Sequence, residues 1–378
     1  MSPRQHAWTH SSPCFQGPGS EHPICVFTDT VFAGGRGISL VTTRQRANHV
    51  ALSPAFTEAE ITMGINQDLN RTVPAKYEMR EIPGKGMGLV ATEHIRRGDL
   101  ILANTASLMI DYRAFNELTE AQYTELQAQA VSSLPSAHRA ALLNLSTHSS
   151  RDGLADAELV NKIAATNSFD IDPWPDDTDQ HHSFFVLFPE IARLNHDCRP
   201  NAEYRFEHAA LAQHVHAARD IAPGEELTLS YVNPLMTRAQ RLQRLERNWG
   251  FRCGCPLCAL PPARAAESDA RIELARKLKQ ELGAWDAGSR ATPEMAELLV
   301  SLYETERLWG SMHEAYTLAA LEFSAAGDAW TAVKYARLGI EWGIPMVGEH
   351  DEDLAELRSL AEDPWAHWSW RRRVERDG

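Results

Sequence analysis

The chain has 378 residues, of which 43% are hydrophobic and 23% are charged; these proportions exclude a wholly disordered, collagen-like or coiled-coil protein. Its 51 acidic residues outnumber 37 Lys plus Arg, giving a net charge of −14, which disfavours direct binding to nucleic acid or an anionic membrane because phosphates are bound by basic groups. No apolar run reaches the roughly 20 residues that cross a bilayer, and the opening residues lack the pattern of a secretory signal. We therefore expect an intracellular protein, cytoplasmic or nuclear.

The first 76 residues predict a tail followed by an extension. Residues 1–22 are rich in Ser, Pro, Gly and His, a composition typical of a disordered tail. Residues 23–76 begin with two β-rich runs on either side of Ala33-Gly34-Gly35, which predicts a β-hairpin. Cys14 and Cys25 are expected to be free. The alternative is a zinc site formed by these two cysteines and nearby histidines, in addition to the cysteine cluster described below, although the spacing of these residues is irregular.

The middle of the chain alternates between strand and helix patterns. Strand-like segments fill residues 77–110 and are broken by the turns PGKGMG and RGD. Between 114 and 165 the hydrophobic spacing becomes helical, which predicts a helical insertion. Strand-like segments resume at 184–188, 202–206 and 226–232, with Pro and Gly between them.

The sequence beyond residue 260 is helical in pattern, with candidate helices at about 267–284, 293–309, 312–325, 328–342 and 351–361. Two of these flank Gly327-Asp328 and carry small residues where helices would touch, which resembles a tetratricopeptide-type hairpin. No exact repeat of that length is present, so a plain helical bundle remains the alternative. This helical domain could bind a protein partner.

Cys253, Cys255 and Cys258 lie within six residues. Thiolates at this spacing converge readily on one tetrahedral metal ion, above all in a reducing compartment. A closed structural zinc site takes four ligands, so the cluster needs a further ligand from elsewhere in the chain.

Four short segments carry the other residues of chemical interest: GKGMGL at 84–89, NHDCRPN at 195–201, GEELTLSY at 224–231 and FRCGCPLC at 251–258. Alone, each has an ordinary explanation, because a G-x-G between strands is usually a turn and a tyrosine at a strand end is usually in the core. Taken together and in this order along the chain, the four segments resemble those of the SET-domain lysine methyltransferases. The segments FPEIARLNHDCRPNA and WGFRCGCPLC are most similar to fungal SET proteins that resemble the MYND-containing family, although no MYND module is recognised in this chain.

The resemblance covers about residues 77–258 and implies an α+β fold. A β-rich SET domain of small antiparallel sheets with a pseudoknot is expected over 77–232, with the helical insertion at about 114–165. A zinc-bearing post-SET segment is expected at 233–259, followed by an all-α, TPR-like domain at 260–378.

The resemblance also implies S-adenosylmethionine as the cofactor. Glycines at 86 and 88 would let the backbone approach a ligand closely. Another G-x-G lies at residues 35–37, but it is not followed by the Ile-x-x-Gly-Asp turn that follows residues 86–88. It is expected to form a hairpin instead of a cofactor loop. The methionine end would lie along the G-x-G loop, the adenine and ribose near the Asn-His pair, and an aromatic ring would cover the adenine. The expected cofactor residues are Lys85, Gly86, Met87, Gly88, Asn167, Asn195, His196 and Phe251.

Tyr231 is the residue expected to carry catalysis. A lysine with a pKa of about 10.4 is charged at pH 7, and neutralising it costs about 4.6 kcal/mol; a nearby sulfonium and an apolar channel both lower this pKa. The Tyr231 hydroxyl can orient the amine and the methyl group without being a strong base. Phe169 and Trp249 are expected in the substrate channel, and because relatives commonly carry Tyr at the second position, the number of methyl groups and the acceptor stay open.

The metal ligands implied by the resemblance are Cys198, Cys253, Cys255 and Cys258 around one structural zinc. The predicted function is an S-adenosylmethionine-dependent protein-lysine N-methyltransferase acting on a lysine-containing protein, with neither nucleic acid nor membrane as a partner. Two alternatives stay open: a SET-fold enzyme acting on a small-molecule metabolite, and a non-catalytic SET and helical-repeat binding module. The negative charge would help to attract a cationic substrate.

Overall fold

The structure is a computed structural model that describes residues 8–18, 21–66, 75–148, 150–173, 183–286 and 288–374. The chain forms two compact units. Unit 1 comprises residues 1–75, 102–194 and 206–215, and unit 2 comprises residues 76–101, 195–205 and 216–378. The predicted domain over 77–232 is therefore shared between both units, because its helical insertion packs in one cluster with the N-terminal extension and with β7 and β9, whereas β4 and β5 belong to unit 2.

Unit 1 is built on a six-stranded sheet in the order β1-β2-β3-β7-β9-β8. The hairpin predicted around residues 33–35 is confirmed, because β2 and β3 pair antiparallel, and β3 pairs parallel with β7. Both β2 and β3 are buried along their whole length. The strands are β1 (His10–Phe15), β2 (Ile24–Asp29), β3 (Ile38–Thr43), β7 (Leu108–Asp111), β8 (Phe169–Ile171) and β9 (Phe184–Leu187).

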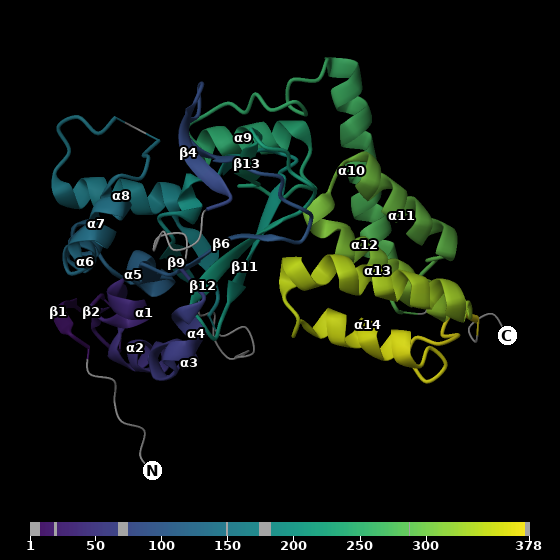
Figure 1. The fold of residues 1–378 in the computed structure, drawn as a ribbon, viewed down its shortest axis with the longest axis horizontal. Helices are drawn as coiled ribbons and strands as arrows, with labels where there is room; N and C mark the ends of the chain where they lie inside the picture. Colours follow the sequence, from purple (N-terminus) through teal and green to yellow (C-terminus); the bar gives the residue numbers. More distant parts are fainter. Residues whose placement is uncertain are drawn as a thin grey trace, which may run out of the picture. The chain divides into compact units, whose positions relative to one another are not determined.

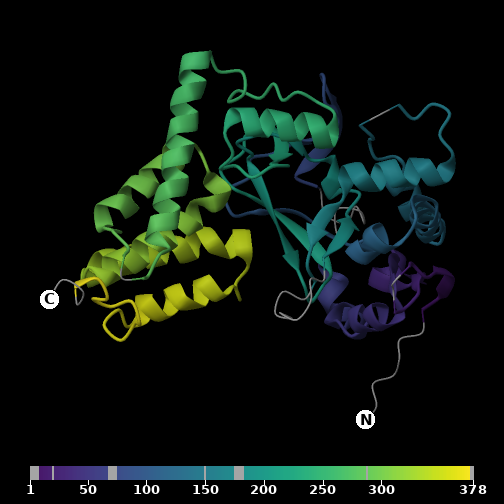
Figure 2. The ribbon, with the colours of Figure 1, turned by 180° about the vertical axis from the view of Figure 1, so that it is seen from behind.

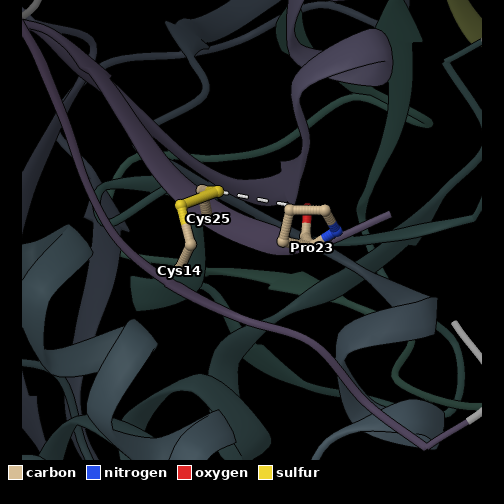
Figure 3. Close-up of a disulfide and its surroundings, with 3 residues drawn as sticks. All are labelled: Cys14, Pro23 and Cys25. Atoms are coloured by element: carbon tan, nitrogen blue, oxygen red, sulfur yellow. Dashed lines mark hydrogen bonds between the residues drawn. A yellow bond between two sulfur atoms is a disulfide. The ribbon is translucent and has the colours of Figure 1, made fainter. Parts of the chain in front are cut away.

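The N-terminal segment differs from its prediction in two respects. Residues 10–15, assigned to a disordered tail, form strand β1, while residues 1–7 and 19–20 lie outside the described part. The expectation of free cysteines is wrong, because Cys14 and Cys25 form a disulfide (Figure 3). The reason is the register of β1 on β2, which places these two residues opposite each other with their Cα atoms 4.1 Å apart.

The helical insertion is confirmed. Its helices α6 and α8 pack together and on the sheet of unit 1, burying Leu126, Ala130 and Ile163 in one cluster with Ile24 and Val26 of β2. Helix α6 begins with a capping box in which Thr119 and Gln122 satisfy each other's backbone N–H groups. The helices of this unit are α1 (Phe32–Gly35), α2 (Arg44–Val50), α3 (Pro54–Thr57), α4 (Ala59–Met63), α5 (Tyr112–Glu117), α6 (Glu120–Ser132), α7 (Ser136–Leu143) and α8 (Asp156–Asn167), and the 3₁₀ turn η2 (Ile191–Arg193) follows β9.

Unit 2 begins with a four-stranded sheet in the order β10-β13-β5-β4. Strand β5 pairs antiparallel with β4 on one side and with β13 on the other, and the short β10 runs parallel to β13. A three-stranded sheet has the order β11-β12-β6, and the division between the units falls within these three strands. The strands are β4 (Tyr77–Ile82), β5 (Gly86–Ala91), β6 (Leu100–Thr105), β10 (Asn195–His196), β11 (Ala202–Glu207), β12 (Ala212–Ala217) and β13 (Glu226–Leu229).

The C-terminal part of unit 2 is helical, as predicted, and α13 and α14 run side by side in Figures 1 and 2. Their close approach depends on glycine: a Cβ at Gly339 or Gly343 would lie 2.6 or 2.5 Å from a methyl group of Leu357 or Leu354, respectively. Of the helices in this C-terminal part, α9 was absent from the prediction. These helices are α9 (Arg238–Trp249), α10 (Pro262–Leu282), α11 (Pro293–Thr305), α12 (Met312–Ala325), α13 (Ala329–Val347) and α14 (Glu352–Glu362), with the 3₁₀ turn η3 (Trp309–Ser311).

Among the residues that the structure describes, no helix has the length and apolar character needed to span a membrane.

Candidate functional site

The G-x-G segment lies at the turn between β4 and β5 in unit 2. Gly84 and Gly86 have φ angles of +75° and +78°, a backbone region that side chains rarely adopt. Gly88 has a different constraint: a Cβ there would lie 2.7 Å from the side-chain nitrogen of Asn195. Lys85 and Met87 flank these glycines with partly exposed side chains. The segment therefore presents backbone and side-chain groups next to β10.

Asn195 and His196 form β10, and their side chains have different partners. The Asn195 Nδ2 group donates to Glu226 Oε1 at 2.9 Å. The His196 Nδ1 atom accepts from the backbone N–H of Tyr231 at 3.0 Å, so the ring proton lies on Nε2, 3.3 Å from Cys198 Sγ. Burial lowers the pKa of His196 to about 4, which keeps the ring neutral near pH 7. His196 thus connects the tyrosine backbone to the cysteine cluster.

Tyr231 follows β13 and lies among aromatic rings. Its ring centroid is 5.3 Å from those of both His196 and Trp249, and 6.5 Å from that of Phe251. Burial, together with the negative charge of Glu226, raises the pKa of the Tyr231 hydroxyl. The phenol therefore stays neutral at physiological pH and can both donate and accept a hydrogen bond.

The four cysteines predicted as ligands come together in unit 2. Cys198, Cys253, Cys255 and Cys258 are all buried, and their sulfur atoms lie within 4.8 Å of one another. A Zn–S distance of about 2.3 Å in a tetrahedron requires sulfurs about 3.8 Å apart, and the distances from Cys198 Sγ to Cys253 and Cys258 are 3.9 and 3.5 Å. Hydrogen bonds from Cys198 and then Cys253 lower the pKa of Cys258 below that of an ordinary thiol. This donor set can hold a metal ion.

Helix α9 places a buried arginine against this cluster. Arg241 is only 1% exposed, and its guanidinium interacts with the sulfurs of Cys198 and Cys258. Burial would lower the pKa of Arg241, but the charges of these two thiolates raise it. The helix ends at Trp249, where Gly250 adopts the left-handed conformation of a C-cap with a φ of +70°. The same helix thus supports both the cysteine cluster and the aromatic group around Tyr231.

Asn201 and Glu226 are two residues at this site that sequence reasoning missed. Asn201 is buried and holds β13 through its side chain, which donates to Glu226 O and accepts from Thr228 N at 2.9 Å each. Glu226 carries the carboxylate that contacts Asn195 and also pairs with Lys85 at 2.6 Å. The available signals were the last Asn of NHDCRPN and the second Glu of GEE, but neither segment shows that the two would meet.

Asn167 and Phe169 belong to unit 1. The Asn167 Nδ2 group donates to the carbonyl oxygens of Ser146 and Ile163 at 2.8 Å, at the end of α8. Phe169 lies on β8 with its ring centroid 5.9 Å from that of Phe188. Their meeting with the unit 2 residues stays a prediction.

The comparisons with known proteins agree with this arrangement. The SET domain family model matches residues 86–232, from the first glycine of β5 to the residue after Tyr231. The chain contains a SET domain. This stretch holds the G-x-G, Asn-His and Glu-Glu-to-Tyr segments, whereas Trp249, Phe251 and three of the four cysteines lie just beyond it.

Proteins with related SET sequences are named as lysine methyltransferases. Histone-lysine N-methyltransferase SET5 of Meyerozyma guilliermondii is 47% identical over 19% of this chain and 15% of that protein. N-lysine methyltransferase SMYD2-B of Danio rerio is 40% identical over 19% of this chain and 16% of that protein. Histone-lysine N-methyltransferase set5 of Schizosaccharomyces pombe is 24% identical over a longer stretch, 77% of this chain and 85% of that protein.

The homology is thus to SET5-type and SMYD-type methyltransferases. The matched stretch spans less than a fifth of the length of the first two of these relatives. The solved SET domain of LSMT bound to lysine and AdoHcy covers 82% of this chain and 91% of that one at 13% identity, with a TM-score of 0.32. A score this low adds nothing to the SET-domain match.

Proposed function

We propose that the protein is an S-adenosylmethionine-dependent protein-lysine N-methyltransferase. The observation that carries this proposal is the group of aromatic rings around the neutral Tyr231, linked through His196 to the segment that carries Asn195. The SET-domain match over the same residues and the names of the relatives support it. Because several relatives are named as histone-lysine methyltransferases, we extend the proposal to nuclear or cytoplasmic action on a lysine-containing protein.

The residues proposed to hold the cofactor are those of the G-x-G turn and of β10. Lys85 and Asn195 offer a charged and a polar group, Met87 offers a partly exposed apolar side chain, and Phe251 offers a ring that can cover the adenine. The side chain of His196 already has two partners, so its contribution would come from the main chain. Asn167 would complete the set from unit 1. When bound, S-adenosylmethionine supplies an electrophilic methyl group carried on a sulfonium.

Tyr231 and Trp249 are proposed to receive the substrate amine, with Phe169 in the same channel. The ammonium must lose a proton before it can attack, at a cost of about 4.6 kcal/mol at pH 7, and aromatic surroundings reduce this cost because they disfavour the charged form. The Tyr231 hydroxyl then accepts a hydrogen bond from the amine and orients its lone pair. Its raised pKa means that it orients the amine as a phenol and does not act as a phenolate base.

One structural zinc is proposed at Cys198, Cys253, Cys255 and Cys258. Four thiolates leave no open position for a reacting water, so the ion would hold the segment of β10 to the chain that carries Phe251. Plasma mass spectrometry of the purified protein should find about one zinc per chain. Cys258→Ser should lose this metal, and Cys14→Ser should keep it because Cys14 lies in the disulfide of unit 1. Equal zinc in all three proteins would contradict this assignment.

The helical C-terminal part is proposed to be TPR-like and to bind a protein partner. The support is the packing of α12 on α13 across the turn at Gly327-Asp328, where Gly327 has a φ of +86° and Asp328 caps α13. The net charge of −14 favours a basic partner or substrate.

The test of the enzymatic proposal uses the full chain, S-adenosylmethionine and a lysine-rich protein such as a histone mixture. Mass spectrometry should detect S-adenosylhomocysteine together with methyl-lysine in the product. Tyr231→Phe should lower turnover about 100-fold, whereas Tyr112→Phe, which changes a tyrosine on α5 of unit 1, should leave it unchanged. Methylation of small amines without any protein methylation would overturn the choice of substrate, and full activity of Tyr231→Phe would overturn the role of the tyrosine.

A further inference from the structure

Three side chains that are distant in the sequence meet in unit 2 beside the G-x-G turn: Lys85, Asn195 and Glu226. Glu226, the first residue of β13, receives the ammonium group of Lys85 on Oε2 at 2.6 Å. Its other carboxylate oxygen, Oε1, receives the Asn195 Nδ2 group at 2.9 Å. One carboxylate therefore holds both a cation and an amide.

This contact fixes the orientation of the Asn195 side chain. An ionised carboxylate only accepts hydrogen bonds, so the amide must turn its NH₂ group toward Glu226. The same NH₂ group lies 3.4 Å from the Met87 carbonyl oxygen, which is also an acceptor. The Asn195 Oδ1 atom has no hydrogen-bond donor among the described residues, and it is left as an acceptor for a ligand.

The space that these groups occupy depends on Gly88. A Cβ at this position would lie 2.7 Å from Asn195 Nδ2 and 3.3 Å from Glu226 Oε1. Distances below 3.0 Å require one of the atoms to shift. The second glycine of the motif therefore makes room for the amide and the carboxylate, in addition to any contact of its own backbone with a ligand.

The ion pair between Lys85 and Glu226 contributes little to the stability of the fold. The Lys85 and Glu226 side chains are 37% and 19% exposed, and ion pairs that water reaches contribute little to folding because solvent screens them. A partly exposed cation, an anion and a fixed acceptor side by side instead match a zwitterion, which carries a carboxylate and an ammonium on one carbon.

We propose that Glu226 is a positioning residue that adapts this site to the zwitterionic amino-acid end of the methyl donor. Lys85 takes the ligand carboxylate, and Asn195 Oδ1 accepts from the ligand ammonium. Glu226 holds both partners in place and adds the negative charge that balances the ammonium. This inference rests on the proposed function, because it assigns a part of S-adenosylmethionine to each residue.

The test compares ligands with and without the amino-acid end. Calorimetric titrations would use S-adenosylmethionine, S-adenosylhomocysteine and 5′-methylthioadenosine, which keeps the nucleoside and the sulfur but lacks the zwitterion. Glu226→Gln preserves the shape of the side chain, removes its charge and lets the Asn195 amide rotate. It should weaken binding of the first two ligands about 10-fold, since hydrogen bonds to charged groups have this weight, and leave 5′-methylthioadenosine unchanged.

Glu225→Gln is the matched control. Glu225 is the neighbouring acid, but it pairs with Arg219 at 2.7 Å and accepts from Ala222 N, so its loss should not affect any of the three ligands. Circular dichroism would check the fold, and Lys85→Met, which removes the cation of the same pair, should give the same selective loss if Glu226→Gln fails to fold.

Two results would overturn the role of Glu226 while leaving the proposed function standing: unchanged affinity for S-adenosylhomocysteine in Glu226→Gln, or an equal loss for 5′-methylthioadenosine. A wild-type protein that binds none of the three ligands would instead overturn the proposed function, and this inference with it.

Discussion

The Arg199 guanidinium donates to Glu306 Oε2 at 2.9 Å, which joins the residue after Cys198 to the end of helix α11. The same guanidinium donates to the carbonyl oxygens of Cys198 and Pro234. Glu306 is 4% exposed and also receives Arg271 and Ser268 at 2.7 Å. The chain around the cysteine cluster is therefore anchored to the helical part of unit 2 through one buried carboxylate.

Glu306→Gln should strongly destabilise the protein. Burial alone would raise the pKa of Glu306, but hydrogen bonds from Ser268, Arg271 and Arg199 hold it below its ordinary value, so the group is ionised and compensates two arginines. Removing one partner of a buried ion pair costs about 3 kcal/mol or more. Urea unfolding followed by tryptophan fluorescence would measure this loss.

The control for this variant is Glu267→Gln, which breaks the exposed pair of Arg264 and Glu267 on α10. A pair at the surface contributes less than about 1 kcal/mol, so this variant should unfold close to the wild-type midpoint. Similar midpoints for the two variants would show that Glu306 does not anchor the two parts.

Local sequence patterns predicted the parts of the site that lie on short segments. The glycines at 86 and 88, the pair Asn195-His196 and the three clustered cysteines each have a spacing that is visible in the sequence. The structure brings Cys198 to these cysteines, as the resemblance implied. What the sequence could not provide was Glu226, because its contact with Lys85 joins residues 141 positions apart.

Helix α9 was not predicted because its buried face includes a charged residue as well as an apolar one. Arg241 lies on that face between Leu245 and the turn before the helix, and its charge interrupts the hydrophobic period that identifies an amphipathic helix. The start of the helix was nevertheless visible, since Thr237 and Gln240 form a capping box.

The disulfide and strand β1 were missed for one common reason. The composition of residues 1–22 is that of a tail, and strand pairing with a distant partner overrides composition. Only once β1 is placed on β2 do Cys14 and Cys25 become neighbours. The division into two units was equally invisible, because it depends on the insertion packing against β2 and β3.

Gly88→Ala should weaken binding of S-adenosylmethionine. The added methyl group would lie 2.7 Å from both Asn195 Nδ2 and Ile82 Cγ1, and would push the asparagine amide away from its position. Loss of one hydrogen bond to a charged ligand group corresponds to about 10-fold in affinity, and calorimetry would measure it.

Gly84→Ala is the control for Gly88→Ala, because it strains the backbone of the same turn without crowding the Asn195 side chain. Gly84 has a φ of +75° with open space around it, so alanine there should cost about 1 kcal/mol of stability and leave the affinity unchanged. Equal losses of affinity in both variants would show that the turn, and not the room for Asn195, sets binding.

Arg241→Met should weaken the retention of zinc. Four thiolates and Zn²⁺ carry a charge of −2, and Arg241 is the buried cation that faces two of the sulfurs. Loss of a group that supports metal ligands typically costs 10- to 100-fold in metal affinity, so transfer of zinc to a chromogenic chelator should be faster by about that factor. Arg244→Met, on the exposed face of the same helix, should release zinc at the wild-type rate. Identical rates for the two variants would remove Arg241 from the metal site.

His138 should make unit 1 sensitive to acid. The ring is 6% exposed, its Nδ1 atom lies 2.8 Å from the Arg36 carbonyl oxygen, and its other nitrogen contacts Ser107. Burial, and then the charge of Arg36, lower the pKa of His138 to about 4, against 6.5 for the ordinary ring. Because the unfolded chain takes up the proton first, the stabilisation is complete above pH 6.5 and is lost as the pH falls toward 4. The loss of folding free energy reaches about 3 kcal/mol.

His138→Gln should lower the free energy of unfolding at pH 7.5. It should also reduce the decrease in this free energy between pH 6.5 and 4 relative to wild type, as measured by urea unfolding at each pH. Parallel pH profiles for the two proteins would show that this ring is not the group that titrates.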